Sequence, residues 1–365
     1  MTTALLKNGG GLGVRYPEIF IAGGATELPP AQDVRAAVAA GRLDARIADR
    51  TEALAVTVSD GPSGPELAAR AARRAFTEAG APGLDLLLHA TVYYQGHDLW
   101  APASYVQREV LADAPGCVPC PAVEIRQLSN GGMAALELAA GYLAATPGRG
   151  HALLTAGDRF EAPGFDRWNG DPGTHYADGG SALLLSNRDG FARLRSLATV
   201  SAPELEGMHR GDDPFGAAPF AHRPVVDMET TKRAFVSRTG VGRCTALVSA
   251  GQRRALETAL DEAGNKLADI DWFVLPHLGR RRLEAAFFTP FGIDPERSTW
   301  PWSRAVGHLG AGDQFAGLDH LRRSGALRPG QLVLLVGIGA GFTWSCAVIE
   351  VLGPPRPSGK GTEAA

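Results

Sequence analysis

Short apolar runs alternate with helical segments along most of the chain. The runs have the length of buried strands, and several of the helical segments end at glycine. We predict strands at 84–91, 122–126, 151–156, 180–186, 191–200, 272–276, 332–337 and 343–351, and helices at 65–80, 102–113, 131–145, 228–248, 250–264, 280–289 and 313–324.

The order of these elements in the second part of the chain repeats the order in the first. Alternating strands and helices predict an α/β protein with a mainly parallel sheet and helices on its faces. We divide the chain into a first half at 16–200, an irregular linker rich in Pro, His and Asp at 201–225, and a second half at 226–352. Residues 353–365 are predicted to form a disordered tail.

Composition narrows the function classes. The chain of 365 residues has 36 Lys and Arg against 39 Asp and Glu, which gives no reason to expect a nucleic-acid partner. It has no apolar run of transmembrane length and no signal-peptide pattern at its start, so we expect a cytoplasmic protein with no membrane partner. Cys117 and Cys120 form a C-x-x-C, but no second ligand pair follows, so we predict no metal site.

The segment Gln-Leu-Ser-Asn-Gly-Gly-Met at 127–133 is the first candidate for chemistry. A predicted strand leads into Ser129, and a predicted helix follows it. A side chain at a helix N-terminus lies where free N–H groups and the helix dipole favour an alkoxide or an oxyanion. Ser129 is therefore a candidate nucleophile, and the alternative is that it only caps the helix.

Two histidines and one carboxylate are the next candidates. His277 follows a predicted strand directly, a position suited to a general base. His308 and Asp313 lie in Gly-His-Leu-Gly-Ala-Gly-Asp, just before a predicted helix. Asp313 is suited to hold His277 in one tautomer, or it is simply a helix cap; His308 is a second candidate for the same pocket. A glycine-rich turn at 337–341 either presents a backbone N–H to an oxyanion or is a plain hairpin.

In their order and spacing, these segments resemble the thiolase-fold ketoacyl synthase III family over about residues 16–352. The family's nucleophile segment is similar to Leu-Ser129-Asn-Gly-Gly, and its Pro-His segment to Leu-Pro-His277. Its Gly-Asn segment looks like Gly-His308-Leu-Gly, and its final Gly-Gly-Gly-x-Thr-Trp resembles Gly-Ala340-Gly-Phe-Thr-Trp. Tyr-Ala-Asp178-Gly-Gly-Ser-Ala is similar to the family's Gly-Asp-Gly-Ala-Gly.

The resemblance implies two stacked, similar halves in a five-layer α-β-α-β-α core. It also implies a homodimer in which the partner chain extends the substrate pocket. Trp100 matches the position of the family's aromatic residue that reaches across the dimer, and we assign Asn130 to the same pocket.

Two departures from the family pattern are informative. Ser129 replaces the usual Cys, and His308 replaces the usual Asn. The segment that ends in Asp313 is similar to the ketosynthase III-like acyltransferases of antibiotic pathways. That resemblance implies that Ser129 is the nucleophile, His277 the base and Asp313 the residue that orients the base. The backbone N–H groups of Ser129 and Ala340 would form the oxyanion hole.

This set of residues favours transfer over condensation. Decarboxylative condensation requires two donors for an enolate, and an anionic Asp313 beside His277 opposes such a charge. We therefore predict an acyltransferase that moves an acyl group through Ser129 to a hydroxyl, amine or thiol acceptor in a polyketide- or antibiotic-type pathway. His308 could donate to a carbonyl, so a starter-type decarboxylative condensation stays open. A catalytically silent partner of an active ketosynthase is the third alternative.

The donor is expected to be an acyl carrier protein or an acyl-coenzyme A. Arg280, Arg281 and Arg282 follow His277 at a predicted helix start, and three guanidinium groups suit the acidic helix and phosphate of a carrier protein. The alternative is a solvated helix face. No resident cofactor is predicted, because the donor itself carries phosphopantetheine or coenzyme A.

Overall fold

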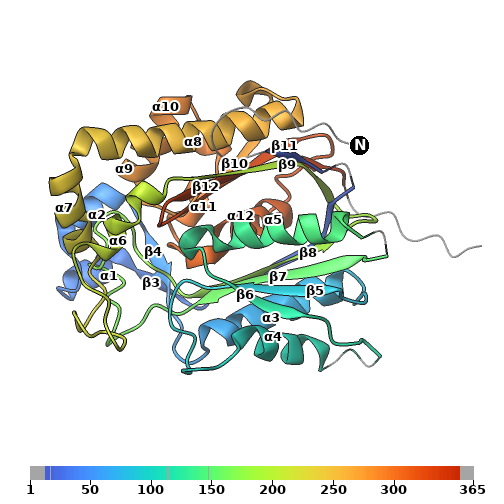
Figure 1. Ribbon diagram of the computed structural model, residues 1–365, viewed down its shortest axis with the longest axis horizontal. Helices are drawn as coiled ribbons and strands as arrows, with labels where there is room; N and C mark the ends of the chain where they lie inside the picture. The colour runs from blue at the N-terminus through green and yellow to red at the C-terminus, as the bar shows by residue number, and fades with distance from the viewer. Residues whose placement is uncertain (1–12, 17, 113, 115, 147, 354–365) are drawn as a thin grey trace, which may run out of the picture.

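The computed structural model describes residues 13–353, apart from 17, 113, 115 and 147. Figure 1 shows five layers, with two layers of strands separated and covered by helices. This is the predicted α-β-α-β-α arrangement. From one face to the other, the helical layers hold α8 (Val241–Ala263), then α5 (Gly131–Ala144) with α12 (Asp313–Arg323), then α3 (Gly64–Glu78) with α4 (Pro102–Leu111).

The strands follow the order β10-β11-β12-β9-β2-β8-β7-β5-β6. One layer contains β10 (Trp272–Val274), β11 (Leu332–Gly339), β12 (Thr343–Val351) and β9 (Ala192–Ser201). The other contains β2 (Phe20–Glu27), β8 (Gly179–Ser186), β7 (His151–Asp158), β5 (Leu86–Ala90) and β6 (Ala122–Ile125). A short pairing of β2 with β9 joins the layers. β1 (Val14–Arg15) pairs with β9, and β3 (Ala31–Asp33) pairs with β4 (Ala55–Thr57).

The prediction of a mainly parallel sheet is wrong. Among the described strands, the parallel pairs are β10–β11, β5–β6 and β5–β7, and the other pairs are antiparallel. Parallel neighbours need a long crossover connection. The links from β7 to β8 and from β11 to β12 contain no such helix, so these strands run in opposite directions.

The remaining helices are short, apart from α7. They are α1 (Val34–Ala39), α2 (Ala45–Thr51), α6 (Gly207–Arg210), α7 (Met228–Thr239), α9 (Arg280–Leu283), α10 (Thr289–Phe291) and α11 (Trp300–Ser303). The predicted break between two long helices near 249 lies instead at Gly240, whose φ of 87° ends α7. The helix predicted at 280–289 divides into α9, a π-helical turn and α10.

The division into two halves and a linker stays a prediction. The strand β9 falls in the predicted first half but pairs along β12, a strand of the second. The predicted linker contains a 3₁₀ turn at Pro203–Leu205 and the helix α6. Of the predicted tail, Gly353 is described, and 354–365 lie outside the described residues.

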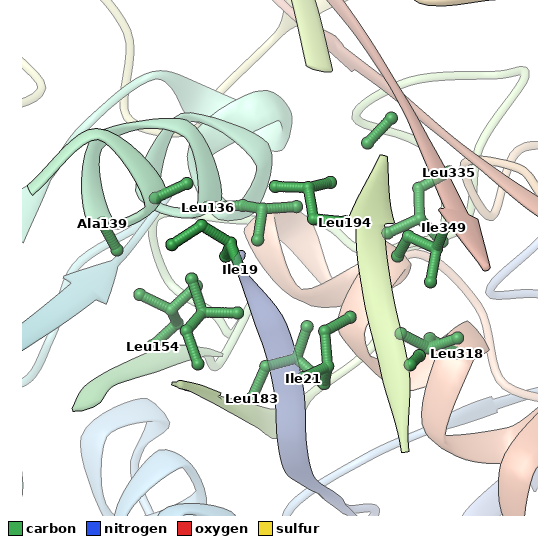
Figure 2. Packing of buried hydrophobic residues seen from close by; sticks show 14 of the residues in the cluster. Ile19, Ile21, Leu136, Ala139, Leu154, Leu183, Leu194, Leu318, Leu335 and Ile349 are labelled. Carbon is green, nitrogen blue, oxygen red and sulfur yellow. The ribbon is translucent and has the colours of Figure 1, made fainter. Parts of the chain in front are cut away.

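The largest apolar cluster fills the space between the two strand layers. Figure 2 shows side chains from both layers meeting those of the central helices, including Leu136 of α5 and Leu318 of α12. Burying each such side chain stabilises the fold by roughly 1.5–3 kcal/mol. This core fixes both central helices, and the N-termini of those helices carry Ser129 and Asp313.

The strand β6 forms one end of the strand order, and its pairing partner among the described residues is β5. Its Val123 side chain is 45% exposed, which is unusual for an apolar residue in a sheet. Leu138 on the neighbouring helix α5 is also exposed. Within the described ranges, every helix is too short or too polar to cross a lipid bilayer.

Candidate active site

Ser129 lies in a 3₁₀ turn (Leu128–Asn130) between β6 and α5. The turn begins with Leu128 at a φ of 47°, a left-handed conformation that costs a non-glycine residue roughly 1–2 kcal/mol. Asn130 is the N-cap residue of α5 and makes no side-chain capping bond. The Ser129 hydroxyl hydrogen-bonds a histidine instead, so it serves the site and not the helix end.

A continuous chain of hydrogen bonds links Ser129, His308 and Asp313. The Oγ atom of Ser129 lies 2.8 Å from Nε2 of His308, and Nδ1 of His308 lies 2.6 Å from Oδ2 of Asp313. A carboxylate can only accept, so this contact places a proton on Nδ1. Nε2 of a neutral His308 is then free to accept the proton of Ser129.

Asp313 is the most constrained group of the site. Oδ2 also accepts the backbone N–H of His277 at 2.8 Å, and Oδ1 accepts that of Leu309 at 2.8 Å. Burial raises the pKa of Asp313, but the contacts of its carboxylate with His277 and His308 outweigh burial, and the net result is a pKa below the usual range. The carboxylate is therefore ionised at neutral pH.

His277 also lies beside Asp313, but its geometry differs from the expected one. Its Nδ1 donates to the carbonyl oxygen of Gly307 at 2.9 Å and lies 3.3 Å from Oδ1 of Asp313. Its Nε2 is buried and has no hydrogen-bond partner among the described residues. Burial lowers the pKa of His277 against the opposing influence of Asp313. The expected order was Ser129–His277–Asp313, whereas the hydrogen bonds run Ser129–His308–Asp313.

The turn between β11 and β12 contacts the nucleophile turn. A Cβ atom added at Gly339 would lie 2.4 Å from the carbonyl oxygen of Gln127, so the two backbones are closely apposed. Ala340 follows, and it is not among the residues with positive φ, so alanine fits its conformation. Its assignment to an oxyanion hole stays a prediction.

The two residues assigned to the substrate pocket have different surroundings. Asn130 is buried, and its Nδ2 donates to Ser345 Oγ at 2.8 Å and to Gln127 Oε1 at 2.7 Å, which ties the nucleophile turn to β12. Trp100 lies in the loop between β5 and α4, 37% exposed, and its ring packs against His97 and Tyr105.

The three arginines predicted to bind a carrier protein separate into three environments. Arg282 is partly buried, and its guanidinium binds both carboxylate oxygens of Asp171 and the hydroxyl of Thr174. Arg280 pairs with Glu284 at 3.1 Å. Arg281 is exposed. Arg282 therefore has a structural role, and Arg281 is the member most available to a partner.

Sequence reasoning missed two residues that lie around His308. The Tyr176 ring packs edge-on against the His308 ring, with centroids 5.0 Å apart. Asp158 lies buried at the end of β7. The end of a strand parallel to its neighbour is a usual place for functional groups, so the position of Asp158 was a signal, and Tyr176 begins the Tyr-Ala-Asp178 segment that resembles a family motif.

Comparisons with known proteins first define the class. The solved 3-oxoacyl-(acyl carrier protein) synthase III of Pseudomonas aeruginosa PAO1 aligns with a TM-score of 0.71 over 93% of this chain and 100% of that chain, at 21% identity. The molecule therefore has the fold of the thiolase-type enzymes.

Nearer relatives define the family. The solved acyltransferase ChlB3 is 36% identical, with a TM-score of 0.87 over 93% of this chain and 99% of that chain. The beta-ketoacyl-[acyl-carrier-protein] synthase III of Sphingopyxis alaskensis is 28% identical over 292 residues, 78% of this chain and 83% of the relative. The family model for the 3-oxoacyl-[acyl-carrier-protein] synthase III C terminal matches residues 260–351. The chain belongs to the ketoacyl synthase III-like family and is a transferase.

Proposed function

We propose that the protein is an acyltransferase that carries the acyl group on Ser129 between a thioester donor and a hydroxyl, amine or thiol acceptor. The observation that carries this proposal is the hydrogen-bonded chain from Ser129 through His308 to Asp313. The likeness to the acyltransferase ChlB3 supports the same reaction class. The general base is His308, in place of the His277 expected from the sequence.

In the first half-reaction, Oγ of Ser129 attacks the thioester carbonyl carbon as its proton passes to Nε2 of His308. A serine hydroxyl needs such a base, because its own pKa is far above neutrality. The ionised Asp313 stabilises the imidazolium that forms. The tetrahedral intermediate then expels the thiolate, which takes the proton from His308 and leaves as a thiol.

In the second half-reaction, the acceptor replaces the thiol. His308 removes a proton from the acceptor hydroxyl, amine or thiol as the acceptor atom attacks the ester carbonyl of acyl-Ser129. The bond from the carbonyl carbon to Oγ breaks, and Oγ takes the proton back from His308. Ser129 is regenerated, and the transferred proton is returned in each half-reaction.

The protonation of the two histidines argues against condensation. A decarboxylative condensation requires N–H donors aimed at the enolate oxygen. The Nδ1–H of His277 is bound to the carbonyl of Gly307, which leaves its neutral Nε2 without a proton. Nε2 of His308 faces the hydroxyl of Ser129. Condensation and a catalytically silent subunit are the alternatives that the experiment below distinguishes.

The donor is an acyl carrier protein or an acyl-coenzyme A, and the phosphopantetheine that it carries replaces any resident cofactor. The exposed Arg281, four residues beyond His277, supports the carrier protein because a guanidinium suits both the acidic helix and the phosphate of such a partner. We place the reaction in the cytoplasm, in a pathway of the polyketide or antibiotic type.

Intact-protein mass spectrometry with a panel of acyl-coenzyme A and acyl-carrier thioesters tests the proposal. We expect a mass increase equal to the acyl group in the wild type and in the control variant Ser104→Ala, which alters an exposed serine of α4. Ser129→Ala should show none. An adduct that persists in Ser129→Ala removes the serine from the mechanism. Carbon dioxide release from a malonyl donor would indicate condensation, and a folded wild type that no donor acylates would favour the silent subunit.

We also propose that the protein is a homodimer in which two copies meet at β6. The exposed Val123 on this edge strand supports an apolar contact surface, and Leu99 and Trp100 in the loop between β5 and α4 are further exposed apolar residues. Light scattering on the purified protein should give twice the 38.3 kDa of one chain. Val123→Lys should shift the mass towards a single chain, and a wild type of single-chain mass would contradict the proposal.

A further inference from the structure

Asp158 is a buried carboxylate that the proposed mechanism does not use. It ends β7, and its side chain is fully buried. Its Oδ1 accepts the backbone N–H of Tyr93 at 2.8 Å and that of Val92 at 3.0 Å, and the side-chain amide of Gln95 at 3.2 Å. Every one of these partners donates, so the ionised form of the carboxylate is the form that they satisfy.

Asp158 has no salt bridge to Lys or Arg within the described part of the chain. Burial raises the pKa of Asp158 to about 7, although the backbone N–H groups and His308 favour its ionised form. Keeping a carboxylate in such a place costs free energy unless a positive charge forms beside it. In the proposed reaction, the positive charge that forms nearby is the His308 imidazolium.

The carboxylate also contacts the turn that separates His308 from Asp313. This 3₁₀ turn (Gly310–Gly312) packs directly against the Asp158 side chain. A Cβ atom added at Gly310 would lie 2.6 Å from Oδ2 of Asp158, so the contact needs glycine there. The turn is thereby held at the end of β7.

The opposite side of the same turn packs against the nucleophile helix. A Cβ atom added at Gly132 of α5 would lie 2.4 Å from the carbonyl oxygen of Ala311. The turn is therefore fixed between Asp158 and the N-terminus of the helix that follows Ser129. Because this turn begins two residues after His308, its position helps to set where His308 lies relative to Ser129.

Two buried side chains, His89 and Thr155, hold Gln95 in place beside Asp158. Oε1 of Gln95 lies 3.2 Å from Nε2 of His89, and Nδ1 of His89 lies 2.8 Å from Oγ1 of Thr155. Burial lowers the pKa of His89 to about 4, so this histidine is neutral and does not compensate the charge of Asp158. The pair fixes Gln95, and Gln95 in turn orients the carboxylate.

We propose that Asp158 is a positioning residue for acyl transfer: it fixes the Gly310–Gly312 turn so that His308 reaches Ser129, and its charge stabilises the His308 imidazolium. This inference rests on the proposed function. Both parts act on the transition state of acylation and leave the binding of the donor unchanged.

Single-turnover acylation of Asp158→Asn at about pH 8, above the pKa of Asp158, tests the inference. The maximal rate should fall roughly 10²-fold, and the half-saturating donor concentration should change by less than about twofold. The matched control is Asp319→Asn, which alters another buried aspartate that pairs with Arg322 and Arg323 on the far part of α12. Its maximal rate should equal that of the wild type.

Three outcomes overturn the inference. The first is an Asp158→Asn variant that acylates at the wild-type rate. The second is an equal loss of acylation rate in Asp158→Asn and Asp319→Asn, because equal losses indicate general destabilisation. If Asp158→Asn does not fold, Gln95→Met replaces it; it leaves the carboxylate in place and should slow acylation about 3- to 10-fold with unchanged half-saturation. The third is a wild type without any adduct on Ser129, which overturns the proposed function as well.

Discussion

His308→Asn should lower the acylation rate on the order of 10⁴-fold or more, while His277→Asn should lower it far less. Asparagine retains a donor near the position of Nδ1, so His308→Asn keeps a partner for Asp313, and His277→Asn keeps one for Gly307. Only the first substitution removes the nitrogen that faces Ser129. The two variants are therefore matched in chemistry and differ in their contact with the nucleophile.

The measurement is the rate of the mass increase on Ser129 under saturating donor, with thermal unfolding as the check on folding. If His277→Asn is as inactive as His308→Asn, the assignment of the base role to His308 alone is wrong. If His308→Asn acylates normally, the hydrogen bond between Ser129 and His308 has no part in the reaction.

Asp313→Asn should lower the acylation rate about 10³- to 10⁴-fold. An amide nitrogen facing Nδ1 of His308 donates where the carboxylate accepts, so the proton of His308 moves to Nε2. Nε2 then carries a hydrogen and cannot receive the proton of Ser129. The backbone N–H groups of His277 and Leu309 also lose part of their acceptor, so the melting temperature should fall as well.

The rate of Asp313→Asn is compared with that of Asp319→Asn, which shares the helix α12 but lies outside the site. The tautomer argument predicts that donor binding survives, which equilibrium titration with a non-transferable thioester analogue would check. An acylation rate within about twofold of the wild type would show that His308 needs no carboxylate.

All eight predicted strands and the helices α3, α4, α5 and α12 were found close to their predicted positions, because apolar runs and helix boundaries mark them in the sequence. The strand β2 escaped prediction, although it lies in the middle of the strand order, because Gly23 and Gly24 interrupt its apolar pattern. The fold needs a glycine there, since a Cβ atom at Gly23 would lie 2.6 Å from the carbonyl oxygen of Ala75 in α3. The close packing of β2 against α3 requires glycine, and glycine interrupts the apolar pattern by which a strand is predicted.

The residues of the candidate site could be predicted from the sequence, but the hydrogen bonds between them could not. Ser129, His308, Asp313 and His277 do lie together. Which imidazole faces Ser129 depends on the backbone conformation around each residue, and Leu128, directly before Ser129, has a φ of 47°. A leucine carries no signal for a left-handed conformation, so no pattern of residue types could have indicated the choice.

Surface side chains were equally hard to predict from the sequence, as Arg282 shows. Three consecutive arginines at a helix start indicate a charged face, and the sequence cannot show which of them turns inward. Asp171, the partner of Arg282, lies 111 residues earlier in the chain. Pairings across such a separation are set by the fold as a whole, and local sequence does not encode them.

The exposed edge of β6 affects how newly synthesised chains fold and assemble in a cell. An uncovered edge strand with an apolar side chain is a template for aggregation. A newly synthesised chain that has not yet met its proposed partner therefore carries this hazard until the edge is covered. The nucleophile turn begins only three residues after β6 ends, at Ile125. Covering this edge in the proposed dimer would therefore also protect the strand that leads into Ser129.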